Sequence, residues 1–196
     1  MAKKRMIETL VGTALLAAIV FVLQLFVVIP LGAYTITLTL IPIVIGAVLY
    51  GKWSGAFLGA VFGGTVVFQV ITGAAGAMSS QMLLMAPFAT IAICMLKGIA
   101  AGFLAGLLCS AFKKRRTLGV ITAAVTCPLV NTGIFVAALF MFYYDLIVAY
   151  AADNAYADAF AFVFIGVVGV NFLVEFAINV ALIPIVLRII RAVKRK

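Results

Sequence analysis

The sequence predicts an all-α, polytopic membrane protein, a bundle of six transmembrane helices with both termini in the cytoplasm. Three observations lead to this prediction. The residues are 67% apolar and 10% charged, and the mean hydropathy is +1.36, far outside the range of soluble globular domains. The apolar residues form runs, most of them long enough to cross a bilayer, which takes about 20 residues. Of the fourteen lysines and arginines, all but one flank these runs.

The first apolar run follows basic residues, like the start of a secretory signal, but it is longer than a signal core of about 7–15 residues. We therefore expect a retained helix that Pro30 ends. The second run is short for a crossing. We expect it to begin within residues 31–40, where alternating threonines indicate an extended segment or loop. The predicted spans are residues 9–29, 40–50, the run after a turn at 51–55 that ends near 73, 88–112, 118–144 and 160–187.

The connections between the spans predict the orientation. The N-terminus, the turn at Lys52, the block at residues 113–116 and the C-terminal tail all carry lysine or arginine, which places them in the cytoplasm. The other three connections contain no basic residue, and we expect them outside, the second of them as a loop. They are residues 30–39, 73–87 and 145–158. No stretch is polar enough to form a separate soluble domain, so we predict one transmembrane domain over residues 1–196.

The composition also excludes several kinds of site. The three cysteines, Cys94, Cys109 and Cys127, stand singly in apolar segments and the sequence has no histidine, so we expect neither a metal site nor another cofactor. The net charge of +9 could suggest nucleic acid, but the basic residues flank membrane segments and lack interleaved aromatics. With one carboxylate inside a span, Glu175, and no nucleotide-binding motif, the chain is not expected to be an enzyme or to hydrolyse ATP.

Small residues recur at every fourth position on three spans, and helices in lipid approach closely through such rows. The two glycine rows predict that the third and fourth spans pack tightly in the bundle. On the first span, Ala14 and Ala18 form a shorter row, and the residues alone leave open whether it faces the bundle or another protein. The glycine rows are Gly55, Gly59 and Gly63, and Gly98, Gly102 and Gly106.

Lys97 is the one basic residue inside an apolar run, where a cation costs about 2.5–3.5 kcal/mol on insertion scales. Such a residue is a candidate for a binding site or a buried pair, and Glu175 is its expected counterpart. Both a structural ion pair and ligand contact by at least one member are open. On the sixth span Asn171, Glu175 and Asn179 form one polar stripe, which must face protein or water.

Polar residues on four spans lie at a similar depth when each helix is followed in its predicted direction, which indicates a polar pocket open to the outside. The asparagines could serve helix-to-helix hydrogen bonds or ligand recognition. These residues are Gln69, Lys97, Asn131 and Asn171.

Four stretches resemble the S components of energy-coupling factor (ECF) vitamin transporters, in matching order along nearly the whole chain. They are residues 37–43 (TLTLIPI), 51–56 (GKWSGA), 128–135 (PLVNTGIF) and 171–176 (NFLVEF). The resemblance implies a six-helix subunit of the bacterial cytoplasmic membrane that captures a vitamin from outside. It would deliver the vitamin by associating with a transmembrane coupling protein and two cytoplasmic ATPases. It also implies that Ala14 and Ala18 dock on the coupling protein.

The resemblance and the pocket residues together predict the substrate contacts, with Thr39 added from the first motif. A lysine flanked by amides suits a small anion with hydroxyl or amide groups. Residues 128–133 (PLVNTG) and 171–176 (NFLVEF) most resemble the pantothenate-type members of the family, so pantothenate is the first candidate. Riboflavin, folate, queuosine and cobalamin remain alternatives, with aromatic rings available for stacking. A proton-coupled secondary transporter that uses Lys97 and Glu175 is the rival function. The predicted contacts are Lys97, Asn131, Asn171, Glu175, Gln69 and Thr39, and the rings are Phe68, Phe135, Tyr143 and Phe172.

Overall fold

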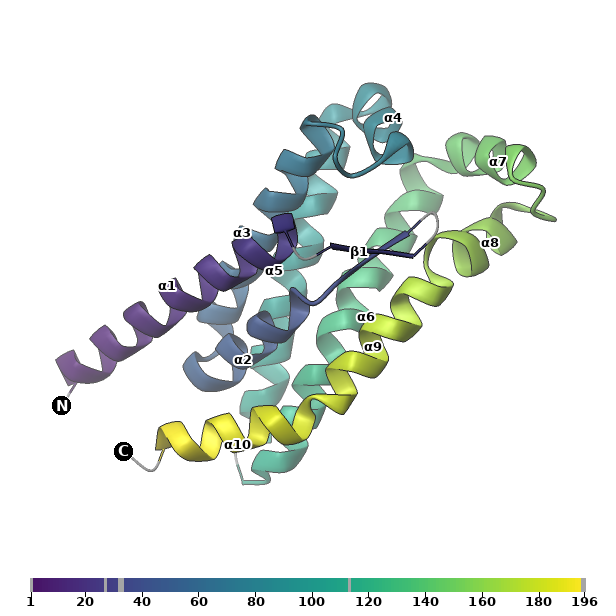
Figure 1. Cartoon of the computed structure of the whole chain (residues 1–196). Coiled ribbons are helices and arrows are strands. Elements are labelled where there is room, and N and C mark those ends of the chain that lie inside the picture. Colours follow the sequence, from purple (N-terminus) through teal and green to yellow (C-terminus); the bar gives the residue numbers. More distant parts are fainter. Residues whose placement is uncertain (1, 27, 32–33, 113, 195–196) are drawn as a thin grey trace.

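Helices make up most of the computed structural model, which describes residues 2–26, 28–31, 34–112 and 114–194 (Figure 1). Two short strands form a hairpin between the first two helices. The elements are α1 (Ala2–Phe26), β1 (Val28–Leu31), β2 (Tyr34–Thr37), α2 (Leu40–Tyr50), α3 (Lys52–Ile71), α4 (Ala77–Met85), α5 (Pro87–Ala111), α6 (Arg116–Phe142), α7 (Tyr144–Asp153), α8 (Ala159–Ala161), the π-helix η1 (Phe162–Val167), α9 (Gly169–Ala181) and α10 (Ile183–Lys194).

Five helical stretches in the described residues are long and apolar enough to cross a membrane, which confirms five of the predicted spans in type and approximate position. They are Met6–Phe26, Lys52–Ile71, Pro87–Ala111, Arg116–Phe142 and Ala159–Arg188. The sixth, α2, has only 11 residues. At about 1.5 Å per residue it reaches roughly half of a bilayer core that is about 30 Å thick. Six crossings and cytoplasmic termini therefore stay predictions.

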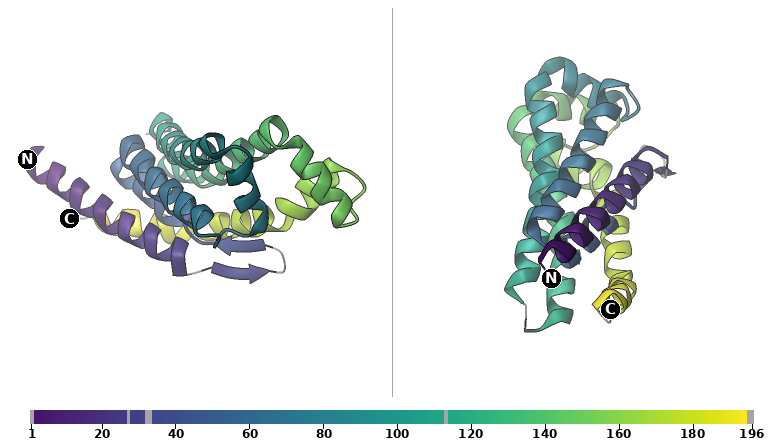
Figure 2. Two further views of the ribbon diagram at one scale, coloured as in Figure 1. Left: turned by 90° about the horizontal axis from the view of Figure 1, so that it is seen from above. Right: turned by 90° about the vertical axis from the view of Figure 1, so that its left-hand side faces the viewer.

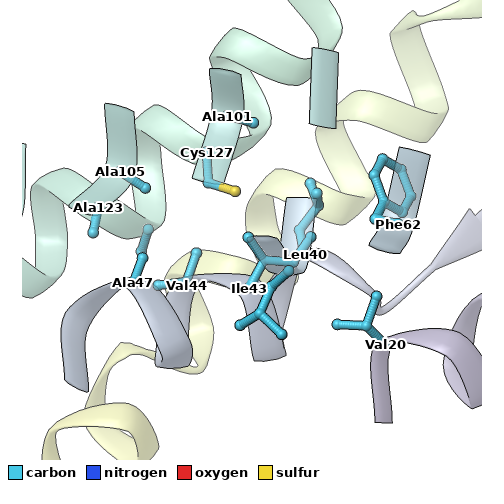
Figure 3. Close-up of a cluster of buried hydrophobic side chains, with 12 residues drawn as sticks. Val20, Leu40, Ile43, Val44, Ala47, Phe62, Ala101, Ala105, Ala123 and Cys127 are labelled. Atoms are coloured by element: carbon cyan, nitrogen blue, oxygen red, sulfur yellow. The ribbon is translucent and has the colours of Figure 1, made fainter. Parts of the chain in front are cut away.

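The short helix α2 lies at the centre of the main hydrophobic core. Leu40, Ile43, Val44 and Ala47 are almost wholly buried there. They pack against α1, α3, α5 and α6, through residues such as Val20, Phe62, Ala101, Ala123 and Cys127 (Figure 3). Because α2 is buried on most sides, its apolar side chains pack against other helices. Its high hydropathy is therefore explained by its position in the core, without contact with lipid.

The segment before α2 is a β-hairpin. Strands β1 and β2 pair antiparallel, from Val28 opposite Thr37 to Leu31 opposite Tyr34. The prediction of an extended threonine segment is confirmed, but the expectation that the helix begins among the threonines is wrong, because α2 starts only at Leu40, the last residue of that segment. Pro30 also does not end the first helix, which stops at Phe26. The hairpin crosses the bundle from the end of α1, and β2 contacts α9 (Figures 1 and 2).

Helices α3 and α5 pack with their backbones in direct contact, as the glycine rows predict. A Cβ atom added at Gly59 would overlap the carbonyl oxygen of Gly98, and one at Gly102 would overlap that of Gly55. These rows fix the position of α5, which carries Lys97, against α3.

The prediction of a loop at residues 73–87 is wrong, because this segment contains the helix α4, and the connection at residues 145–158 holds most of the helix α7. Thr90 joins α4 to the bundle. Its hydroxyl is 2.8 Å from the carbonyl oxygen of Met82 and 2.7 Å from the hydroxyl of Tyr143. Tyr143 itself is 1% exposed. This network ties the N-terminal end of α5 and the C-terminal end of α6 to a helix that the sequence pattern did not reveal.

The last span is interrupted, although the sequence predicts one continuous helix. Its first part winds as the π-helix η1, and the backbone N–H of Val168 donates to the carbonyl of Val163 at 2.8 Å. A second break occurs at Leu182, because α9 ends at Ala181, three residues before Pro184. Helix α10 leaves the bundle at an angle to α9 (Figure 1). π-helical turns often occur at functional sites.

Candidate functional site

Three of the predicted contact residues line one cavity of about 120 Å³, although they come from three different helices. Lys97 comes from α5, Asn131 from α6 and Glu175 from α9. The other lining residues are Thr132, Phe135, Val167, Val168 and Phe172. The cavity therefore brings together one ammonium, one carboxylate, one amide and one hydroxyl between two aromatic rings.

Lys97 is half-buried and lies against aromatic faces. Its ammonium nitrogen is 4.9 Å from the centre of the Phe135 ring and 5.9 Å from that of Phe62. A desolvated cation over a ring gains about 2 kcal/mol. Glu175 is 8% exposed, and its charge attracts that of Lys97. Both contacts offset part of the cost of keeping a cation at membrane depth.

Asn131 contributes an acceptor that the protein leaves open. Its Oδ1 atom is buried, and no described residue donates a hydrogen bond to it. Buried polar atoms without a partner are rare in native proteins, and each costs about 1–3 kcal/mol. An acceptor of this kind in the wall of a cavity is suited to a donor group on a bound molecule.

The π-helix places Val167 and Val168 in the cavity wall, and Phe172 follows one turn later. Sequence reasoning missed both valines, and it also missed Thr132. A signal was available at Gly169, where an added Cβ would overlap the carbonyl oxygen of Phe164. Only glycine fits that wide turn without displacing the backbone, so a glycine in an apolar run marked the irregular site.

Gln69 and Thr39 do not line this cavity. The amide of Gln69 donates to the backbone carbonyl of Gln24 at 2.9 Å, and the amide of Gln24 donates back to Gln69 Oε1 at 2.9 Å. The Thr39 hydroxyl donates to Gln24 Oε1 at 2.8 Å. These side chains join α1, α3 and the start of α2 in a separate network, and sequence reasoning missed Gln24, which completes it.

The polar stripe on α9 serves more than one purpose. Glu175 lines the cavity, whereas the amide of Asn179 donates to the Glu175 backbone carbonyl at 2.9 Å. Asn171 lies one turn before Glu175 on α9, and its side chain is outside the described part of the structure.

The four aromatic candidates separate into three groups. Phe135 and Phe172 line the cavity, where they could contact a bound ring. Tyr143 is buried in the network with Thr90. Phe68 is 55% exposed on α3. Of the four, only Phe135 and Phe172 therefore line the candidate site.

Ala14 and Ala18 lie on an exposed face of α1, beside the exposed Leu10, Leu15 and Val22. The opposite face holds Val20, which is fully buried, and Thr13, whose hydroxyl donates to Ser54 Oγ at 3.1 Å. The alanine row thus points away from the bundle, which makes it accessible to lipid or to another protein.

Within the described residues, no three His, Cys, Asp or Glu side chains lie close enough together to hold a metal ion.

Comparison with known proteins gives one match. A family model described as ECF transporter, substrate-specific component, matches residues 8–187, and so includes every residue that lines the cavity. No curated protein and no solved structure is significantly similar to the chain.

Proposed function

The chain belongs to the family of ECF transporter substrate-specific components, and we propose that it captures a small vitamin from the exterior, with pantothenate as the first candidate. Members of this family are transport subunits and not enzymes. The family and the long apolar helices make the chain a multi-pass membrane protein with a small-molecule substrate and ECF module partners.

The cavity of Lys97, Asn131 and Glu175 carries the proposal. A carboxylate on the ligand would accept charge-assisted hydrogen bonds from the Lys97 ammonium. Hydroxyl or amide N–H groups would donate to Asn131 Oδ1 and to Glu175, since an ionised carboxylate only accepts. Pantothenate has one carboxylate, one amide and two hydroxyls, and so offers a partner to each of these side chains.

The size of the cavity supports a small substrate. Its volume of about 120 Å³ lies below the roughly 300–1,000 Å³ of ligand pockets. Binding must enlarge it, least for pantothenate and most for folate, queuosine or cobalamin. Riboflavin is the next candidate, because Phe135 and Phe172 could contact its ring system.

The remaining parts of the proposal concern partners and place. We propose that the single domain of residues 1–196 lies in the bacterial cytoplasmic membrane and works with a transmembrane coupling protein and two ATPases. The exposure of Ala14 and Ala18 supports docking of the coupling protein on α1.

A proton-coupled secondary transporter is the second candidate, because Lys97 and Glu175 share one cavity and attract each other. Two experiments decide between them. Protein purified from cells is unfolded, and the released small molecules are identified by mass spectrometry. We expect one vitamin in stoichiometric amount. No bound vitamin, together with transport into liposomes driven by a proton gradient alone, would reject the substrate-binding subunit in favour of the secondary transporter.

A further inference from the structure

We infer that a groove at the basic end of the bundle binds the headgroup of an anionic phospholipid. This basic groove consists of two adjoining hollows that share Ser110 and Phe112. The first, of about 510 Å³, lies between the last turn of α2, the end of α5 and Arg116 at the start of α6. The second, of about 470 Å³, is lined by Lys114 and Arg115. Both volumes fall within the roughly 300–1,000 Å³ of ligand pockets.

The basic groove combines apolar lining residues with basic ones. Ala47, Val48 and Leu49 give the first hollow apolar lining, Arg116 adds a cation to it, and Lys114 and Arg115 line the second hollow. None of the described residues that line either hollow is acidic. A guanidinium presents five N–H donors in a fork that matches phosphate. The arrangement suits a molecule with an anionic head and a hydrocarbon tail.

Neighbouring residues place the groove at the level of a membrane surface. Trp53 is 73% exposed and packs edge-on against Phe103, with ring centres 5.4 Å apart. The Lys52 ammonium lies 5.4 Å from the centre of the Phe103 ring. Exposed tryptophan beside lysine is typical of the membrane interface. Gly51, which lines the groove, directly precedes this cluster.

A phospholipid explains these features better than an acidic protein segment does. An acidic segment would use the cations but would leave the apolar wall without a function. Basic pockets between transmembrane helices are known to hold anionic headgroups. The groove is also distinct from the Lys97 cavity, because no residue lines both.

Trp53 provides the test, because it is the only tryptophan in the sequence. Brominated lipids quench tryptophan on contact, so the full chain in detergent micelles is titrated with brominated phosphatidylglycerol and, separately, with brominated phosphatidylcholine. We expect brominated phosphatidylglycerol to quench Trp53 at a several-fold lower mole fraction in the micelle than brominated phosphatidylcholine. Arg116→Gln should remove most of this preference, since a basic residue near an anionic surface contributes about fivefold, and Lys114→Gln with Arg115→Gln should also lower it. Arg116→Lys should keep most of it.

The matched control is Lys3→Gln with Lys4→Gln. It removes two charges outside the groove, as many as Lys114→Gln with Arg115→Gln removes inside it, and should leave the lipid preference unchanged. Thermal unfolding without lipid verifies that each variant folds. Equal quenching by both lipids overturns the inference, and so does an equal loss in the Lys3 and Lys4 variant, since that indicates diffuse attraction. If the protein shows no lipid preference but binds a polyglutamate peptide in a way that depends on Arg116, the groove binds a protein partner. That result would also overturn the inference.

Discussion

The ammonium of Lys97 and the ring of Phe135 face each other across one wall of the cavity, 4.9 Å apart. Lys97 comes from α5 and Phe135 from α6, so the pair joins two helices at the site. The ring holds the cation without taking up its N–H donors in a salt bridge. In the proposed function, this contact would support the charge of Lys97 while its N–H groups donate to the ligand.

Replacing Lys97 by Met should weaken binding of an anionic vitamin by about 1.5–3 kcal/mol, the range for hydrogen bonds to charged groups. Titration calorimetry with the purified chain measures the change. The matched control is Lys52→Met, because Lys52 also lies over aromatic rings but outside the cavity. Unchanged affinity in Lys97→Met would remove this residue from the site.

Replacing Asn131 by Leu should move two quantities in opposite directions. The ligand-free protein should gain stability, because a buried acceptor without a partner costs about 1–3 kcal/mol. Vitamin affinity should fall because the ligand loses its acceptor. Asn179→Leu is the control. Its amide has a partner at 2.9 Å, so that variant should lose stability. Thermal unfolding with and without vitamin measures both effects, and a less stable ligand-free Asn131→Leu contradicts the assignment.

Replacing Gly59 by Ala should separate α3 from α5 and destabilise the protein by about 1–3 kcal/mol, the cost of overpacking. Gly64 lies on the same helix with no neighbour within 4 Å of an added Cβ. Gly64→Ala should therefore be neutral or stabilising by up to about 1 kcal/mol, the difference in helix propensity. Unfolding in mixed micelles compares the two. Equal effects would mean that close backbone contact does not stabilise the bundle.

Replacing Tyr143 by Phe should loosen α4. The variant loses the contact to Thr90 at 2.7 Å and the hydrogen bond to the Ala86 carbonyl, at a cost of about 1–3 kcal/mol. Hydrogen exchange of residues 77–85 should accelerate, because this network joins α4 to α5 and α6. Tyr144 is 52% exposed, so Tyr144→Phe should leave exchange unchanged. If both variants exchange alike, α4 is held by other contacts.

Part of the site could be predicted because residue type and position along a helix fix the depth of a side chain in the membrane. Lys97 and Asn131 were predicted at similar depths and Glu175 as the counterpart of Lys97, and all three line one cavity. Depth does not fix how far a helix is rotated or which helices are neighbours. Gln69 has a similar depth, but its amide is satisfied by Gln24 on α1.

For the fold as well, some features could be predicted from the sequence and others could not. Long apolar runs and the rows with Gly59 and Gly98 are regular over many residues, and they predicted the spans and the α3–α5 contact. Helix α4 and the π-helix η1 are short, and tertiary contacts fix them, such as those of Thr90 and of Gly169. Local pattern alone could not reveal these elements, because their stability comes from residues distant in the sequence.

Replacing Ala14 and Ala18 by Leu should prevent co-purification of the chain with a coupling protein, because two bulky side chains would keep a partner helix from approaching α1. Vitamin binding should not change, because both alanines lie on the exposed face and neither lines the cavity. Ala92 is exposed on α5, and Ala92→Leu adds similar bulk outside α1 as the control. Affinity purification of co-expressed subunits measures the complex, and calorimetry measures vitamin affinity.

A complex that survives in the double variant would show that the partner docks on another surface. Loss of the complex in Ala92→Leu as well would mean that added bulk on any lipid-facing helix is sufficient, and the docking face would not be specific to α1.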